Sequence, residues 1–341
     1  MKSFKIAFLL LPIVFTAQSC ELFSTGGTQQ GSGNLGVYLS VDSGDSWKAG
    51  VGTQTFQMGS VAISKIFIQS RDPKNVVAAS TNAGVLASDN HGENWVVLLT
   101  GFAAQDIFIN PFNEQEIFVS GSKGKLAAIY KSPDRGATWI QVYNEPSGES
   151  AVTALAYDLE NPQIMYAGLS TGTMLKSADG GDTWNWFASF KDRVVEIGVR
   201  SGVVYVLSAK GGLARSDDGG VTWTGGKIDK TTKVHNTMLV DPADDQKLYV
   251  GTDSGLWRST DGGGTWQKLP LPATVKVSNV TAVQINPDNH SEIHAAVRST
   301  IYRSSDDGST FRTVQLPTNR VVRDIAIDHE EPNRIYIGLK L

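Results

Sequence analysis

A short pattern, S-x-D-x-G-x-x-W, recurs seven times along the chain and constrains its fold more than any other feature. Successive copies begin 39 to 48 residues apart. Five copies match the pattern in full and begin at Ser40, Ser132, Ser177, Ser216 and Ser259. The copy at Ser88 has Asn90 in place of the aspartate, and the copy at Ser304 has Phe311 in place of the tryptophan. Because this interval is the length of a four-stranded blade, the sequence predicts an all-β, seven-bladed β-propeller.

The residue types of the pattern suit a tight turn between two strands. An aspartate in the third position can accept hydrogen bonds from backbone N–H groups of its own turn, and the following glycine can adopt a positive φ. The final aromatic residue can fold back and pack against the blade. We therefore predict a structural role, and no catalytic or metal-binding role, for the third and last residues of each copy: Asp42, Asn90, Asp134, Asp179, Asp218, Asp261, Asp306, and Trp47, Trp95, Trp139, Trp184, Trp223, Trp266, Phe311.

The two ends of the repeat region complement each other. Residues 36–51 contain only the last two strands of a blade, around the first copy of the pattern, and residues 322–338 contain only the first two strands. Joined together, they complete one blade and close the ring without a free sheet edge. The sequence thus predicts a propeller over residues 36–341, with six continuous blades and one composite blade.

The first residues have the composition of an export signal. Within residues 1–20, a basic start precedes an apolar stretch over residues 6–17, and Ser19 and Cys20 follow. The stretch is too short to span a bilayer and is typical of a secretory signal. Cys20 is the only cysteine and stands where a bacterial lipobox places its lipidated residue, so we predict a lipoprotein signal peptide. The alternative is an unmodified leader cysteine.

Residues 21–35 are rich in Gly, Ser, Thr and Gln and predict a flexible tether. With a lipidated Cys20, this tether would hold the propeller at the bacterial cell envelope as an exported protein. The formal net charge is -4, and no basic block occurs in the sequence. Nucleic-acid binding needs clustered Lys and Arg, so we predict no nucleic-acid partner.

The repeated turns make residues 36–341 resemble the Asp-box, or BNR-repeat, propellers. That superfamily includes sialidases, tandem-propeller xyloglucanases, the sortilin ectodomain, and photosystem II assembly and stability factors. A single propeller behind a lipoprotein leader is most similar to the last group and to sortilin-like propeller proteins of bacteria. The resemblance to the photosystem factors implies a chaperone-like contact with a protein, usually through an Arg-rich patch, and no comparable cluster is visible in this sequence. Sialidases carry an Arg-Ile-Pro motif that is absent here, and xyloglucanases build their cleft between two rings.

Propellers usually bind their partners on the face where loops link the blades. Alignment of the inner strands places four charged residues at one equivalent position near this face: Lys65, Asp106, Glu196 and Asp324. Arg323 lies one residue earlier, and His235 begins an inner strand near the same face. These residues could form a polar mouth that holds a ligand or a basic peptide. The alternative is a ring of mutually paired charges around a water-filled channel.

From these observations we predict a monomeric, non-enzymatic scaffold that binds a protein or another macromolecule at the cell envelope, without a cofactor or metal. The alternative is a glycan-binding or glycoside-hydrolase-like propeller in which Asp106 and Glu196 act as acid and base. Trp186 lies two residues after Trp184 and is expected to extend its packing. The string G-x-S-x-G at residues 168–172 links two predicted strands, whereas a nucleophile elbow needs a strand-to-helix turn.

Overall fold

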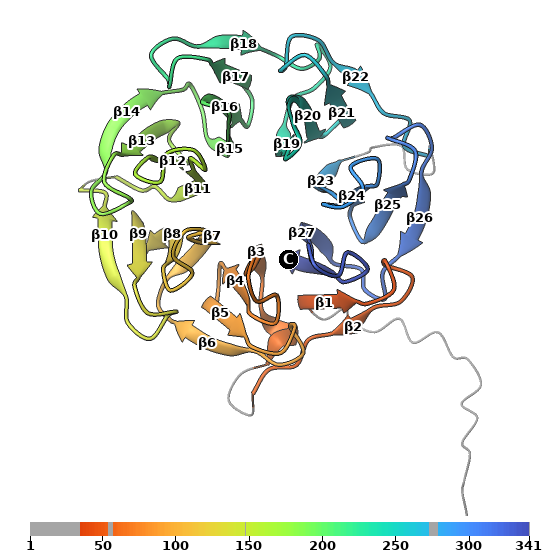
Figure 1. Ribbon diagram of the computed structural model, residues 1–341, viewed down its shortest axis with the longest axis horizontal. Coiled ribbons are helices and arrows are strands. Elements are labelled where there is room, and N and C mark those ends of the chain that lie inside the picture. Colours follow the sequence, from red (N-terminus) through yellow and green to blue (C-terminus); the bar gives the residue numbers. More distant parts are fainter. Residues whose placement is uncertain (1–34, 54–56, 147, 273–278, 341) are drawn as a thin grey trace, which may run out of the picture. The chain divides into compact units, whose positions relative to one another are not determined.

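The computed structural model describes residues 35–53, 57–146, 148–272 and 279–340. In these ranges it contains 28 strands and one 3-10 turn, η1 (Met58–Ser60). The strands form seven four-stranded antiparallel sheets arranged in a ring (Figure 1). Cavities along the axis of the ring form a central channel. The seven sheets confirm the predicted all-β, seven-bladed propeller. Cys20, the signal peptide over residues 1–20 and all but the last residue of the tether over residues 21–35 lie outside the described residues.

Each blade runs from an innermost strand at the channel to an outermost strand at the rim. Blade 1 has β3 (Ile63–Ile68), β4 (Val76–Ser80), β5 (Gly84–Ser88) and β6 (Val96–Leu99). Blade 2 has β7 (Ala103–Ile109), β8 (Ile117–Lys123), β9 (Leu126–Ser132) and β10 (Ile140–Asn144). Blade 3 has β11 (Val152–Tyr157), β12 (Met165–Leu169), β13 (Thr173–Ser177) and β14 (Asn185–Ser189). Blade 4 has β15 (Val194–Arg200), β16 (Val203–Ser208), β17 (Gly212–Ser216) and β18 (Thr224–Gly226).

The remaining blades follow the same order. Blade 5 has β19 (His235–Asp241), β20 (Asp244–Thr252), β21 (Gly255–Ser259) and β22 (Gln267–Lys268). Blade 6 has β23 (Val280–Ile285), β24 (Ile293–Val297), β25 (Thr300–Ser304) and β26 (Arg312–Gln315). Blade 7 has β27 (Val321–Ile327), β28 (Ile335–Lys340), β1 (Gly36–Ser40) and β2 (Lys48–Ala49).

Blade 7 is the composite blade that the sequence predicts. Its two outer strands come from the beginning of the propeller region and its two inner strands from the end. β1 pairs with β28 in an antiparallel register that runs from Gly36 opposite Leu339 to Ser40 opposite Ile335. This pairing closes the ring and leaves neither strand as a free sheet edge.

In all seven Asp boxes the serine hydroxyl makes the same two hydrogen bonds, to the third residue and from the backbone N–H of the glycine. In the first box, the Ser40 hydroxyl donates to Asp42 Oδ1 at 2.7 Å and accepts from the backbone N–H of Gly44 at 2.8 Å. Asp42 also accepts from the backbone N–H of Ser46, and Ser46 donates its hydroxyl to the second carboxylate oxygen. The indole of Trp47 donates to the carbonyl of Gly44 at 3.0 Å. The carboxylate is therefore occupied by its own turn.

The box that contains Asn90 shows a matched pair of substitutions. Asn90 Oδ1 accepts from the backbone N–H of Asn94 at 3.0 Å. In the other six boxes the residue equivalent to Asn94 is Ser or Thr, and its hydroxyl donates to the second carboxylate oxygen. The side-chain amide of Asn90 has only one oxygen, so a Ser or Thr hydroxyl in place of Asn94 would find no second oxygen to donate to in this turn.

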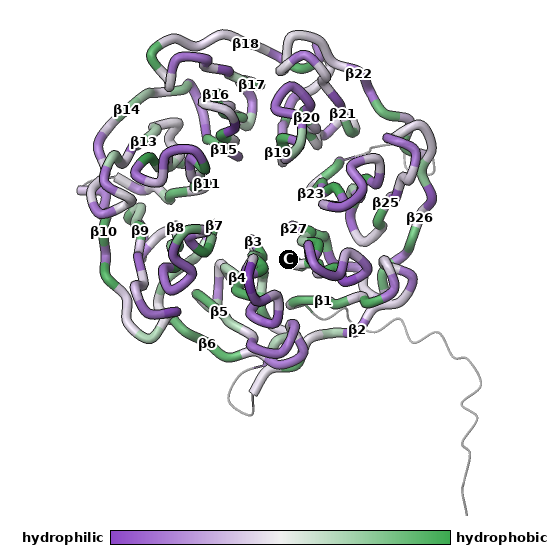
Figure 2. The backbone as a smooth tube through the Cα atoms, in the orientation of Figure 1, coloured by the Kyte–Doolittle hydropathy of each residue, from purple (hydrophilic) through white to green (hydrophobic). Residues whose placement is uncertain are grey.

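The boxes lie on the same face as the turns between the first and second strands of each blade. In six blades the fourth residue of the box donates its backbone N–H to a carbonyl of that turn; Arg135 donates to Gln115 at 2.8 Å, and Asp307 donates to Ser291 at 2.9 Å. The strands alternate in direction, so the loops that link blades lie on the opposite face, which we call the linker face. Figure 2 shows that hydrophilic residues gather in the turns at the strand ends.

Stability is expected to fall as the pH drops from about 4 to about 2. Donors from the residue four positions on, a side-chain hydroxyl and a backbone N–H, lower the pKa of Asp42, Asp179, Asp261 and Asp306 to about 2. Because the unfolded chain binds protons at higher pH than these folded turns, protonation favours unfolding in that window. Urea midpoints at pH 5, 4, 3 and 2 test this, and a flat profile below pH 4 would contradict it.

Hydrophobic side chains fill the space between neighbouring blades. Trp95, Tyr205, Tyr249 and Tyr336 are among the largest fully buried side chains. Trp186 does not extend this packing, because its side chain is 69% exposed on the outer strand β14. The expectation for Trp186 was therefore wrong: β14 is the outermost strand of its blade, and no further strand covers its side chains. No helix in the described ranges is long and apolar enough to cross a membrane.

Candidate functional site at the channel mouth

Every innermost strand has a β-bulge at the same place, and these bulges set the residues that line the channel. In blade 1 the register shifts between Ile63 and Lys65, and in blade 7 it shifts between Val322 and Asp324. The other five innermost strands shift at the equivalent point. A bulge redirects side chains and twists the strand locally. The ring positions aligned in the sequence correspond to these bulges.

Three of the predicted charged residues meet inside the channel. Lys65 Nζ lies 3.4 Å from Glu196 Oε1 and 3.7 Å from Asp324 Oδ1. Lys65 is on β3 and Glu196 on β15, so the first ion pair crosses the channel (Figure 1). The negative charges of Asp324 and Glu196 raise the pKa of the Lys65 ammonium. These three residues therefore form a paired cluster, as the alternative of a paired-charge ring predicts, with one carboxylate more than the single ammonium can balance.

The two channel aspartates also join neighbouring blades. Asp324 Oδ2 accepts the backbone N–H of Ile66 at 2.7 Å, which ties blade 7 to blade 1. Asp106 Oδ2 accepts the backbone N–H of Leu155 at 2.8 Å, which ties blade 2 to blade 3. Burial raises the pKa of Asp106 to about 6, and burial also raises the pKa of Asp324 although the Lys65 charge opposes this. Each of these carboxylates therefore accepts a hydrogen bond from the neighbouring blade.

Polar residues one position earlier make similar contacts at four other blade junctions. Each side chain donates a hydrogen bond to a backbone carbonyl on the innermost strand of the next blade: Ser64 to Ala104 (2.8 Å), Thr153 to Val194 (2.6 Å), Asn236 to Val280 (2.9 Å) and Thr281 to Val322 (2.5 Å). At the junction of blades 4 and 5, His235 Nδ1 lies 3.1 Å from the Ala209 carbonyl oxygen. The wall of the channel is therefore a nearly continuous set of inter-blade hydrogen bonds.

The paired charges divide the channel into two chambers. A cavity of about 340 Å³ opens above them toward the linker face, and one of about 230 Å³ lies below them toward the Asp boxes. The space between, which Lys65, Asp106, Glu196 and Asp324 line, is only about 20 Å³. That is room for about one water molecule. A ligand that enters from the linker face therefore meets the upper chamber alone.

The upper chamber, which we call the basic mouth, is lined by Arg193, Arg323 and Lys340. Within the described ranges, none of the three forms an ion pair with a carboxylate. Burial and then the charge of Arg323 lower the pKa of Arg193, while burial and then the charges of Arg323 and Arg193 lower that of Lys340. Three half-buried cations that disfavour one another attract an anion.

Two buried nitrogen atoms at the basic mouth have no hydrogen-bond partner among the described residues. Arg193 Nε is buried and unpaired in the structure, and so is Nε2 of His235. His235 is 2% exposed, and burial lowers the pKa of its imidazole. Arg323 extends over the channel, with Nη1 3.5 Å from the carbonyl oxygen of Asn236. The mouth therefore offers charge together with unused hydrogen-bonding capacity.

The aligned inner strands predicted Arg323 and His235 at this face, but not Arg193 and Lys340. The absence of an Arg-rich cluster held only for the linear sequence, because the ring brings three distant cations to one chamber. Arg193 directly precedes the innermost strand of blade 4, and Lys340 ends β28. Their positions next to strand ends on the linker face are the signal that could have revealed them. The described residues contain no group of three or more His, Cys, Asp or Glu placed to hold a metal.

Comparisons with known proteins identify relatives of two kinds. A family model described as photosynthesis system II assembly factor YCF48 matches residues 200–338. A xyloglucanase of Hypocrea jecorina (strain QM6a) is 30% identical over 139 residues, which cover 34% of this chain and 17% of that protein. This chain therefore spans only a small part of the curated relative that it matches.

Solved structures of both kinds share the fold. The Niastella koreensis GH74 enzyme has a TM-score of 0.69 at 17% identity, over 88% of this chain and 52% of that enzyme. YCF48 from Cyanidioschyzon merolae has a TM-score of 0.62 at 16% identity, over 82% of this chain and 95% of that protein. A structure of YCF48 bound to a D1 peptide has a TM-score of 0.63 at 14% identity, over 82% of this chain and 93% of that protein.

Proposed function

We propose that this chain, a BNR-type β-propeller with the layout of photosystem II assembly factors, is a non-enzymatic scaffold that binds an acidic segment of a partner protein at the basic mouth. The observation that carries this proposal is the group of Arg193, Arg323 and Lys340, which lines one chamber without a carboxylate partner in the described part of the chain. Support also comes from the solved YCF48 structure with its bound D1 peptide, because a protein of this layout there holds a protein segment.

The charge of the preferred partner follows from the paired groups below the mouth. In the sequence, the carboxylates Asp106, Glu196 and Asp324 favoured a basic peptide as a ligand. In the structure, Glu196 and Asp324 are ion-paired with Lys65, and Asp106 accepts backbone N–H groups. Two carboxylates near the mouth, those of Asp192 and Asp253, also accept hydrogen bonds from backbone N–H groups. Arg193, Arg323 and Lys340, in contrast, have no ion pair with a carboxylate in the described part of the chain, so an anionic segment fits the mouth.

Removal of the two arginines should weaken anion binding at least tenfold. Each charge-assisted hydrogen bond contributes about 1.5–3 kcal/mol, and about 1.4 kcal/mol corresponds to a factor of ten in affinity. Isothermal titration of acetylated hexaglutamate into the full chain and into Arg193→Ala/Arg323→Ala measures the loss. Lys48→Ala/Arg312→Ala removes the same charge from exposed outer strands and should bind as the wild type does.

Two results would contradict the proposed function. The first is no binding of hexaglutamate to the wild-type chain at low ionic strength, where screening is weakest. The second is an equal loss of affinity in the mouth variant and in the outer-strand control. Acetylated hexaglutamine, which has the same length without charge, should not bind to any of these proteins.

The proposed scaffold is exported and anchored to the bacterial envelope through a lipid on Cys20, with residues 21–35 as its tether. This part of the proposal is supported by the leader composition and by the position of the single cysteine. Metabolic labelling with an alkyne fatty acid should mark the wild-type chain and leave Cys20→Ser unlabelled. Absence of label on the wild-type chain would refute the anchor without affecting the basic mouth.

A glycan-active function is the second candidate, and the similarity to a xyloglucanase over 139 residues supports it. Asp106 and Glu196, however, both line a space of only about 20 Å³, which is smaller than a sugar ring. A glycosidase needs its two carboxyl groups to flank the scissile bond. Release of reducing sugar from xyloglucan by the wild-type chain, retained in Asp106→Asn/Glu196→Gln, would point to a hydrolytic site elsewhere.

A further inference from the structure

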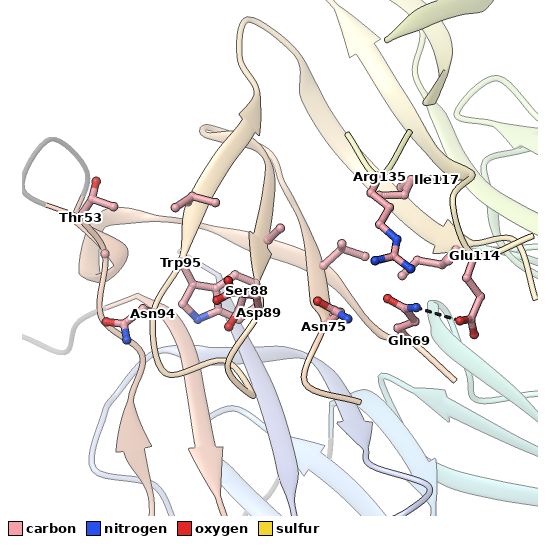
Figure 3. Close-up of a pocket in the computed structure, with 15 residues that line it drawn as sticks. Thr53, Gln69, Asn75, Ser88, Asp89, Asn94, Trp95, Glu114, Ile117 and Arg135 are labelled. Carbon is pink, nitrogen blue, oxygen red and sulfur yellow. Dashed lines mark hydrogen bonds between the residues drawn. The ribbon is translucent and has the colours of Figure 1, made fainter. Parts of the chain in front are cut away.

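Another cavity, of about 330 Å³, lies between blades 1 and 2 on the side of the Asp boxes (Figure 3). Its apolar wall includes Val77 and Ala87 of blade 1 and Ile109 and Ile117 of blade 2. It shares no lining residue with the basic mouth. Its volume is at the lower end of the range for small-molecule sites. We call it the blade 1–2 cavity.

The strand register shows why this cavity exists. Val77 is the second residue of the second strand, and in each of the other six blades the equivalent residue carries a ring: Phe118, Tyr166, Tyr205, Tyr249, His294 and Tyr336. The residue paired with it on the third strand is Ala87 in blade 1. Five other blades have a cation there: Lys131, Lys176, Arg215, Arg258 and Arg303.

At other junctions the ring and the cation pack together and occupy the space between blades. Lys176 Nζ lies 5.3 Å from the centre of the Tyr166 ring, and Arg215 Cζ lies 5.7 Å from the centre of the Tyr205 ring. Such stacking of a cation on a ring face is attractive. Blade 1 has two small apolar side chains in place of this pair, so the space that the pair fills elsewhere stays open.

At the filled junctions, the next blade supplies a hydrogen-bond acceptor for the tyrosine hydroxyl. Tyr205 donates its hydroxyl to the carbonyl of Asp245 at 2.9 Å, and Tyr249 donates to Asp307 Oδ1 at 3.2 Å. In blade 2 the residue equivalent to Asp245 is Glu114, because each lies four residues before the ring residue of its second strand. The residue equivalent to Asp307 is Arg135, because each is the fourth residue of its Asp box. Glu114 and Arg135 both line the blade 1–2 cavity (Figure 3).

Glu114 is held in place at the edge of the cavity. Its Oε2 accepts from Gln69 Nε2 at 2.8 Å, and its Oε1 accepts from the backbone N–H of Arg71 at 2.9 Å. Arg135, in the Asp box of blade 2, is exposed and has a φ of 57°. The cavity thus combines an apolar wall for a flat ring with polar groups at the place where a phenol hydroxyl lies in the filled junctions.

We propose that the blade 1–2 cavity is a binding site for a phenolic ring, which takes the place that the tyrosine ring has in other blades. The ring can belong to a free aromatic compound or to a tyrosine of a partner. The apolar wall formed by Val77, Ala87, Ile109 and Ile117 contacts the ring, and its hydroxyl lies beside Glu114 and Arg135. This site is independent of the proposed scaffold function.

The probe is p-cresol, the side chain of tyrosine as a free molecule, and binding is measured by saturation-transfer NMR and by titration calorimetry with the full chain. The wild type should bind p-cresol and should not bind 4-methylcyclohexanol, which has the same substituents on a ring that is not flat. N-acetyl-tyrosinamide is the second probe. If the cavity holds a tyrosine of a partner, the protein should bind this compound as well as p-cresol. If the cavity holds a free aromatic compound, the protein should bind p-cresol alone.

Val77→Tyr/Ala87→Lys introduces the pair found in blade 3 and should reduce p-cresol affinity at least tenfold. Val77→Phe fills the ring position with a single change. This variant tests the same loss of p-cresol affinity if the double variant does not fold. Arg193→Ala/Arg323→Ala should bind p-cresol as the wild type does, because those residues lie in the basic mouth. Failure of the wild type to bind p-cresol, or unchanged binding in both filled variants, would overturn the proposal.

Discussion

Replacement of Trp95 by alanine is expected to lower the free energy of unfolding by about 4 kcal/mol, the largest loss that we predict for a single substitution. The Trp95 side chain is 0% exposed, and its indole N–H donates to the carbonyl of Gly92 at 2.8 Å. Trp95 belongs to the cluster that joins blade 1 to blade 7, where it lies with Leu39 and Tyr336. Truncation leaves a cavity at the junction that closes the ring. Urea unfolding followed by far-UV circular dichroism measures the change.

Trp186→Ala is the matched control for Trp95→Ala. It removes the same side chain from a strand where 69% of it is exposed. Substitutions at such exposed sites usually change stability by no more than about 0.5 kcal/mol. Equal losses in the two variants would contradict the assignment of Trp95 to the core of the blade 1–7 junction.

Asp324→Ala should lower the free energy of unfolding by about 3 kcal/mol, because it leaves the backbone N–H of Ile66 without its acceptor and weakens the pairing of Lys65. The hydrogen bond from Ile66 is 2.7 Å long, and Lys65 Nζ lies 3.7 Å from the carboxylate. Both contacts join blade 7 to blade 1, which the chain itself connects only through β1 and β2. The urea midpoint reports the loss.

Asp324→Asn separates the two contributions. The amide oxygen can still accept from Ile66, while the charge next to Lys65 is removed, so the expected loss is only about 1 kcal/mol. If asparagine and alanine destabilise the protein equally, the hydrogen bond to Ile66 contributes nothing. If neither substitution changes the urea midpoint, Asp324 does not join the blades.

The ring and its closure could be predicted from the sequence because the Asp box is a local structure. Ser40, Asp42, Gly44 and Ser46 satisfy one another within a few residues of chain, so the same spacing gives the same turn wherever it occurs. Seven copies, with the two half-blades at the ends, then determine the blade count. The seam between β1 and β28 followed from that count without any knowledge of side-chain packing.

The pairing of the channel residues could not be predicted in this way. The inner-strand alignment identified Lys65, Asp106, Glu196, Arg323 and Asp324 because their strands share a bulge position. Which of them meet depends on the width of the channel and the reach of each side chain. Lys65 is long enough to approach Glu196 across the ring, whereas Asp106 reaches only the next strand.

The basic mouth and the blade 1–2 cavity were missed for different reasons. Arg193 and Lys340 are distant in sequence, and only the closed ring brings them together with Arg323. The cavity left a visible signal, since Val77 stands where other blades have Phe, Tyr or His. An alignment of the second strands, in addition to the inner strands and the boxes, would have revealed it.

Photo-cross-linking tests most directly whether the basic mouth is the binding site. An acetylated hexaglutamate peptide that carries photo-leucine is irradiated with the full chain, and the adducts are located by mass spectrometry. We predict adducts at the residues that line the mouth, such as Val195, Val234 and His235, and their loss in Arg193→Ala/Arg323→Ala. Adducts concentrated on the Asp-box face, or an unchanged pattern in that variant, would contradict the account.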